Sequence, residues 1–227
     1  MLFNSVANNS LCTLNKLSKI YHKSSSTDLA HQSLNCYNSL GLKEAETMQK
    51  VESIIIGGGP CGLSAAIEQK RKGIDTLIIE KGNVVESIYN YPTHQTFFSS
   101  SDKLSIGDVP FIVEESKPRR NQALVYYREV VKHHQLKVNA FEEVLTVKKM
   151  NNKFTITTTK DVYECRFLTI ATGYYGQHNT LEVEGADLPK VFHYFKEAHP
   201  YFDQDVVIIG GKNSAIDAAL ELEKAGA

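Results

Sequence analysis

The sequence of 227 residues lacks the features that mark several classes of protein. It contains no apolar run of roughly 20 residues, the length that a helix needs to cross a bilayer. It also lacks an excess of charge of either sign, because 25 lysines and arginines stand against 26 aspartates and glutamates. Nothing electrostatic therefore points to nucleic acid or to an anionic membrane surface. We expect neither among the partners of this protein.

Cysteine pairs and metal-binding patterns are absent as well. The cysteines are Cys12, Cys36, Cys61 and Cys165. They show neither C-x-x-C spacing nor a disulfide framework, so a reducing cytosol, and hence a cytoplasmic location, is the simplest compartment. The histidines His178, His193 and His199 have no ligand partners at metal spacing. We expect no metal site.

Residues 1–47 differ in composition from the rest, being rich in Ser, Asn and Leu, with no arginine and no acid before Asp28. A transit peptide usually favours arginine, and a secretory signal needs an unbroken apolar core, which residues 11–20 do not have. The favoured interpretation is a disordered extension translated from a wrong start, with Met48 as the true first residue. A purine-rich ribosome site could be encoded at Lys43 and Glu44. N-terminal sequencing that found Met1 would contradict this hypothesis.

From Val51 onwards the pattern is that of an α/β protein. The β-branched run 52–56 predicts a buried parallel strand, and 76–79 predicts a second one. Between them, Leu63, Ala66 and Ile67 recur at helical spacing. A further helix is predicted over about residues 121–135.

Residues 137–172 are predicted to form successive short strands, and the first pattern then recurs. The recurring unit is a strand at 206–209, a glycine-rich loop, and a helix through Ile216, Ala219 and Leu220. The fold class predicted is therefore an α/β, Rossmann-like FAD/NAD(P)-binding fold. It combines a parallel sheet with a β-meander, followed by the start of a second Rossmann domain.

The first glycine-rich loop fits G-x-G-x-x-G between a predicted strand and a predicted helix. Gly57 makes the tight turn, Gly59 lets the backbone approach a pyrophosphate, and Gly62 lets the helix pack close to the strand. The helix N-terminus supplies free N–H groups to the pyrophosphate. Glu80 ends the second predicted strand, where a carboxylate accepts from a ribose hydroxyl and disfavours a 2′-phosphate. This site should hold FAD or NAD.

The second loop reads G-x-K-x-x-A in the same context. Its residues are Gly210, Gly211, Lys212, Asn213, Ser214 and Ala215. Lys212 replaces the glycine that permits close approach, so either it reaches a phosphate as a point charge or the loop has lost nucleotide binding. Two dinucleotide sites in one chain imply electron transfer between a nicotinamide and a flavin.

A third segment, Ala171, Thr172 and Gly173, ends an apolar strand. Small residues at such a position let the chain pass close to a bound cofactor. A plain strand end is the alternative.

Together these features resemble the flavoprotein disulfide reductases, and their details are most similar to the bacillithiol disulfide reductases. The segments that carry the resemblance are Ile56–Ser64, Tyr91–Ser99, Ala171–Tyr175 and Gly210–Ala215. Related groups carry a Cys-x4-Cys pair in the first helix region or a Cys-x-x-Cys between the two loops. Neither is present, since no cysteine occurs over 174–209. A dithiol relay is therefore absent.

The resemblance implies FAD in the first site, NADPH in the second, and bacillithiol disulfide as the small-molecule substrate. It implies an FAD-binding domain over 48–175 and the beginning of an NAD(P)H-binding domain over 176–227, with a homo-oligomer in the full-length form. The residues implied to contact FAD are Gly57, Gly59, Pro60, Cys61, Gly62, Glu80 and Lys81. The Ala171–Gly173 turn would lie by the flavin, and Gly210 through Ala215 would hold the second pyrophosphate.

Cys61 is the thiol nearest to the proposed cofactor and the candidate catalytic residue. A helix N-terminus favours the thiolate, which is the form that attacks disulfides. The alternative is a small residue that fills a tight loop. Cys165 is expected to serve packing only.

The sequence ends at Ala227, after the first strand and helix of the second Rossmann unit, so we expect a piece of a protein of roughly 300 or more residues. Two enzymatic alternatives are a flavin monooxygenase-like protein and a ferredoxin/thioredoxin–NADP reductase-like protein. Flavin monooxygenases and ferredoxin–NADP reductases share paired Rossmann motifs without a dithiol. An inactive nucleotide-binding fragment is the alternative from another class.

Overall fold

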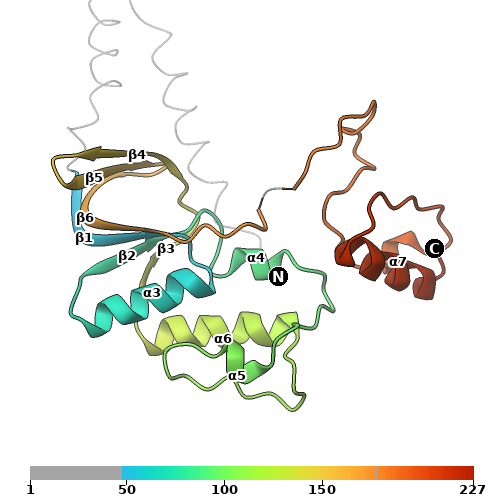
Figure 1. The fold of residues 1–227 in the computed structure, drawn as a ribbon, viewed down its shortest axis with the longest axis horizontal. Coiled ribbons are helices and arrows are strands. Elements are labelled where there is room, and N and C mark those ends of the chain that lie inside the picture. The colour runs from blue at the N-terminus through green and yellow to red at the C-terminus, as the bar shows by residue number, and fades with distance from the viewer. Residues whose placement is uncertain (1–47, 177) are drawn as a thin grey trace, which may run out of the picture. The chain divides into compact units, whose positions relative to one another are not determined.

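A computed structural model describes residues 48–176 and 178–227. The interpretation of residues 1–47 falls outside this range. The described chain contains one mixed sheet of six strands in the order β3-β2-β1-β6-β5-β4 (Figure 1). The strands are β1 (Gln49–Ile56), β2 (Thr76–Ile79), β3 (Lys137–Asn139), β4 (Val144–Met150), β5 (Lys153–Thr158) and β6 (Val162–Ile170).

The sheet has a parallel half and an antiparallel half, as the sequence predicted. Strand β1 pairs in parallel with β2 and β6, and β2 pairs in parallel with β3. Strands β4, β5 and β6 form an antiparallel meander. Asn151 and Asn152 both have positive φ, 46° and 63°, which suits the two-residue turn that joins β4 to β5.

Helices cover one face of the parallel half, and the meander packs on the other (Figure 1). The described helices are α3 (Pro60–Arg71), α4 (Glu86–Tyr89), α5 (Ser101–Leu104), α6 (Arg120–His133), η1 (His199–Tyr201) and α7 (Asn213–Ala225). Of these, α3 and α6 pack on this face of the sheet. Because side chains alternate along a strand, Ile55 of β1 packs with α3 and α6 while Ile54 packs with the meander. None of the helices in this described part is long and apolar enough to cross a membrane.

The prediction of a strand at residues 206–209 is wrong. These residues have no regular structure, and Val207 and Ile209 are 87% and 68% exposed. A strand is stabilised by ladder hydrogen bonds, and no strand within 48–176 or 178–227 pairs with this segment.

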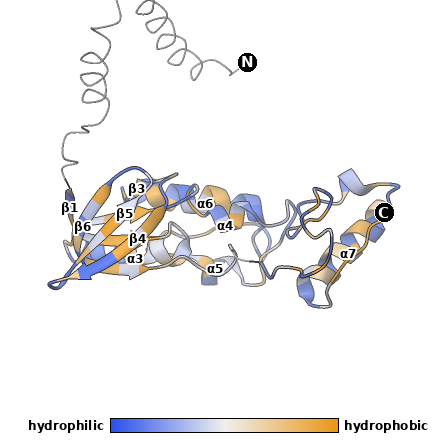
Figure 2. Ribbon diagram, turned by 90° about the horizontal axis from the view of Figure 1, so that it is seen from above, coloured by the Kyte–Doolittle hydropathy of each residue, from blue (hydrophilic) through white to orange (hydrophobic). Residues whose placement is uncertain are grey.

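Helix α7 forms where it was predicted, but its apolar stripe faces outward. Ile216 and Leu220 are exposed, whereas Ala218 and Leu222 are buried. Figure 2 shows hydrophobic segments of α7 in orange, the colour that also marks the hydrophobic parts of the strands. The stripe has no sheet to pack on among the described residues.

Candidate functional site

The first glycine-rich loop connects the carboxyl end of β1 to α3 and lies against the end of β6. Gly57 has a φ of 109°, a conformation that only glycine adopts readily, and its N–H donates to the Ile79 carbonyl at 2.9 Å. A Cβ at Gly57 would lie 2.4 Å from the Ala171 carbonyl oxygen. The turn is therefore packed directly on the Ala171–Gly173 segment, which the sequence placed beside the cofactor.

The other two motif glycines differ in their surroundings. A Cβ at Gly62 would lie 2.0 Å from the Gly57 carbonyl oxygen, so helix and turn touch through the backbone. At Gly59 a Cβ would meet nothing within 4 Å. Pro60 begins α3, and the N–H groups of Cys61 and Gly62 in its first turn have no carbonyl before them in the helix to bind. Open space beside free N–H groups fits a pyrophosphate.

Glu80 follows β2 and is buried beneath the loop. Its Oε2 accepts from the Gly58 N–H at 2.6 Å, and its Oε1 accepts from the Gly82 N–H at 2.9 Å. Gly58 and Gly82 belong to this arrangement, and the sequence reasoning missed both positions. A Cβ at Gly58 would lie 3.2 Å from Glu80 Cβ, a close approach that only the folded structure reveals. The carboxylate predicted to bind a ribose thus also holds the loop in shape.

The Ala171–Gly173 turn continues into an aromatic cluster. Gly173 has a φ of 67°, and Thr172 and Gly173 are exposed. The Tyr91 and Tyr175 rings lie 4.8 Å apart, centroid to centroid, in an edge-to-face contact. Burial raises the pKa of the Tyr91 hydroxyl, with a further contribution from Tyr174. Lys81 is exposed, and a Cβ at Gly176 would lie 3.7 Å from its Nζ.

The two described cysteines differ in access. Cys61 is exposed in the first turn of α3, whereas Cys165 is buried within β6. Burial raises the pKa of the Cys165 thiol, which keeps it protonated. Cys61 alone of this pair is placed to react with a disulfide.

The second loop is built around the start of α7. Gly210 has a φ of 135°, and Lys212 is the N-cap residue of the helix, which Asn213 begins. Gly211 has nothing within 4 Å of a Cβ, and Gly210–Ser214 are exposed while Ala215 is half-buried. The helix N-terminus is therefore open, but the supporting strand that was predicted before it is missing.

Residues 54–227 match the family model described as pyridine nucleotide-disulphide oxidoreductase. The chain belongs to this oxidoreductase family. The resemblance predicted from the loop motifs is confirmed at this level.

Individual relatives of this oxidoreductase include bacilliredoxin reductase Bdr of Bacillus subtilis, 67% identical over 79% of this chain and 56% of the relative. Two are solved structures of bacillithiol disulfide reductase Bdr. The Bacillus cereus structure is 61% identical, with a TM-score of 0.77, over 79% of this chain and 57% of that one. The Staphylococcus aureus structure is 95% identical, with a TM-score of 0.66, over 73% of this chain and 63% of that one. The chain thus spans little more than half the length of these relatives. The predicted fold class is confirmed.

Behind Glu80, this oxidoreductase contains a buried polar cluster that the sequence did not reveal. Glu142 is 2% exposed, and its Oε1 accepts from the Thr158 hydroxyl at 2.6 Å and from the Tyr163 hydroxyl at 2.9 Å. Asn139 Nδ2 donates to the Tyr163 oxygen at 2.9 Å. These residues come from β3, the loop after it, β5 and β6, so only the folded sheet brings them together.

The Tyr163 hydroxyl should make the folded protein less stable at alkaline pH. Burial and the hydrogen bond to the Glu142 carboxylate, with the charge of Asp161, outweigh the Asn139 hydrogen bond and raise the pKa of Tyr163 to about 12 from 10.0. Because the folded-state pKa lies above the unfolded one, this stabilisation is full below about pH 10 and is lost as the pH rises towards about 12. Denaturant unfolding should give a lower free energy of unfolding at about pH 11 than at about pH 9. This difference should be smaller in Tyr163→Phe. An equal loss in the variant would contradict this assignment.

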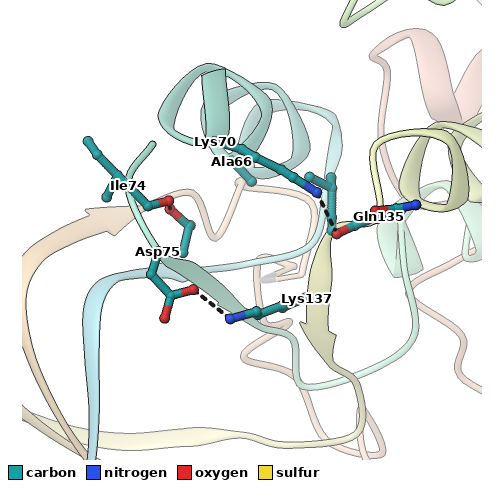
Figure 3. Close-up of a pocket in the computed structure, with 8 residues that line it drawn as sticks. Ala66, Lys70, Ile74, Asp75, Gln135 and Lys137 are labelled. Atoms are coloured by element: carbon teal, nitrogen blue, oxygen red, sulfur yellow. Dashed lines mark hydrogen bonds and ion pairs between the residues drawn. The ribbon is translucent and has the colours of Figure 1, made fainter. Parts of the chain in front are cut away.

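A shallow pocket lies at the opposite edge of the sheet, where β2 and β3 begin (Figure 3). Lys137 Nζ pairs with Asp75 Oδ1 at 2.6 Å, and Lys70 Nζ donates to the Gln135 carbonyl at 3.1 Å. Ligands of open α/β sheets bind outside the carboxyl ends of the strands, where Gly57 and Glu80 lie. The pocket is therefore separate from the candidate site.

Proposed function

We propose that the whole protein is a cytoplasmic, FAD-containing and NADPH-dependent disulfide reductase, with bacillithiol disulfide as its substrate. The observation that carries this proposal is the loop at residues 57–62, open at Gly59 and closed at Gly57 and Gly62, with Glu80 beneath it. This arrangement suits a dinucleotide with a free ribose hydroxyl. The names of the Bacillus cereus and Staphylococcus aureus relatives support the substrate.

Each group in the site has a role in this reaction. The amides of Cys61 and Gly62 would hold the FAD pyrophosphate, and Glu80 the ribose. A bound flavin would supply two-electron redox chemistry between NADPH and a disulfide. One NADPH, one proton and one disulfide thus become NADP⁺ and two thiols. Lys212 and its neighbours would hold the nicotinamide dinucleotide.

Cys61 is proposed as the residue that attacks the disulfide: its thiolate would form a mixed disulfide with one half of the substrate while the S–S bond breaks and the other half leaves as a thiol. The two electrons supplied by NADPH would then cleave the mixed disulfide, which releases the second thiol and restores Cys61. Cys61→Ala should keep bound FAD and lower NADPH-dependent disulfide reduction by about 100-fold or more, because no second described thiol is accessible. The measurement is NADPH oxidation at saturating disulfide, with the flavin spectrum recorded on the same sample. Cys165→Ala is the matched control and should retain activity, since its thiol lies in the core. Full activity in Cys61→Ala would remove the catalytic role.

The proposal itself is tested with the purified whole protein. We expect a flavin spectrum, and NADPH oxidation that depends on bacillithiol disulfide rather than on glutathione disulfide or cystine. A colourless protein would favour the inactive nucleotide-binding form instead. NADPH oxidation coupled to oxygen uptake and to oxygenation of a substrate would favour a flavin monooxygenase-like activity.

A second candidate substrate is the protein disulfide of an oxidised bacilliredoxin, which the name of the Bacillus subtilis relative favours. The same assay separates the two substrates. Saturable oxidation of NADPH with oxidised bacilliredoxin, at a higher kcat/KM than with bacillithiol disulfide, would assign the protein substrate.

A further inference from the structure

The Glu142 carboxyl group is buried, and a polar or charged group is costly to bury unless it is paired or hydrogen-bonded. Within residues 48–176 and 178–227, no lysine or arginine forms a salt bridge with it. It is held by the hydroxyls of Thr158 and Tyr163, on strands β5 and β6 of the meander. Such a costly group in the core calls for a physical role.

The backbone next to this carboxylate holds Glu80 on both sides. The Glu80 N–H donates to the Asn139 carbonyl at 2.9 Å, and the Glu142 N–H donates to the Glu80 carbonyl at 2.9 Å. The side chain of Glu80 is bound by the amides of Gly58 and Gly82. Both backbone groups and both carboxylate oxygens of Glu80 are thereby engaged, which leaves this residue little freedom to move by itself.

The contacts form a closed ring. It runs from Glu80 to Asn139 through the backbone, from the Asn139 amide to the Tyr163 hydroxyl, and from there to the Glu142 carboxylate. It returns from the Glu142 N–H to Glu80. Loss of the Tyr163 hydroxyl would leave the Asn139 amide without this acceptor and Glu142 with Thr158 as its remaining described hydroxyl partner. We therefore expect the loop 139–142 to shift, and Glu80 to shift with it.

We propose that Asn139, Glu142 and Tyr163 are positioning residues for the dinucleotide site, which they control through Glu80. The β-meander thus sets how well the loop at Gly58 is shaped for FAD. The inference rests on the proposed FAD site and adds to it three residues outside the glycine motif.

The test compares Tyr163→Phe with Ile156→Val in the whole protein. Tyr163→Phe removes one hydroxyl from the ring, whereas Ile156→Val removes one methyl group from the same meander core. We expect Tyr163→Phe to raise the FAD dissociation constant about tenfold. It should also speed hydrogen exchange at the Gly58 and Gly82 amides in the flavin-free protein. Ile156→Val should lower Tm and leave both readouts unchanged. Equal changes in the two variants would overturn the proposal.

Two further variants show whether the effect passes through Glu80. Glu142→Gln keeps an acceptor oxygen for both hydroxyls and should bind FAD more tightly than Glu142→Ala. In a Glu80→Ala background, Tyr163→Phe should have no additional effect on FAD affinity, because coupled sites are not additive. Additive losses would contradict the inference. If the unaltered protein binds no FAD, the proposed function fails, while amide exchange at Gly58 still decides the role of the ring.

Discussion

Gly62→Ala should lower the free energy of unfolding by about 3 kcal/mol and abolish FAD binding. The added methyl group would lie 2.0 Å from the Gly57 carbonyl oxygen, and this neighbour is backbone, which cannot swing aside as a side chain can. Helix α3 would have to move away from β1, taking its N-terminal amides out of place. Denaturant unfolding of the flavin-free protein and titration with FAD measure the two effects.

Gly59→Ala is the matched variant for this prediction. Its methyl group would meet nothing within 4 Å, and the φ of −78° at this residue suits alanine. The unfolding free energy should therefore change by no more than about 0.5 kcal/mol. FAD affinity should nevertheless fall about a hundredfold, equivalent to ~2.7 kcal/mol, because the methyl group occupies the space that a pyrophosphate needs. Equal destabilisation in both variants, or FAD binding retained in Gly62→Ala, would refute this account of the loop.

Glu80→Ala is expected to have the second largest effect, with a loss of about 3 kcal/mol in unfolding free energy and much weaker FAD binding. The reason is that two backbone N–H groups, at Gly58 and Gly82, lose a charged acceptor within a largely buried site. Glu80→Gln should lose about half as much stability, since its amide oxygen satisfies one of the two N–H groups. Urea unfolding and FAD titration of both variants measure the series.

Glu86→Gln provides the control for Glu80. Its carboxylate also accepts a backbone N–H, from Asn83 at 2.9 Å, but this hydrogen bond is exposed to water. Water can replace the acceptor there, so we expect a change within about 0.5 kcal/mol. A Glu86→Gln loss equal to that of Glu80→Gln would show that burial does not set the cost.

Much of the sheet and of the first loop was predictable because the signals are local. The run 52–56 and the residues 76–79 are short and β-branched, and both lie in strands of the structure. The glycines of the first loop have spacings that a tight turn and a close helix require. Positive φ at Gly57 and the contact at Gly62 follow from those requirements.

The segment 206–209 shows where local signals fail. Its residues, Val-Val-Ile-Ile, have the composition of a buried strand, yet Val207 is 87% exposed and the segment pairs with no strand among the described residues. A strand depends on a neighbour for its hydrogen bonds, so propensity alone does not form it.

The sequence by itself determined the family, the parallel sheet with its meander, and the position of the dinucleotide loop, because glycine spacing and β-branched runs act over a few residues. The tertiary structure alone decided what surrounds Glu80. Its carboxylate reaches Gly58 across 22 residues of sequence, and Tyr163 is joined to Glu142 and Asn139 across 21 and 24. Such pairs depend on strand register, since a shift of one residue turns every side chain to the opposite face of the sheet.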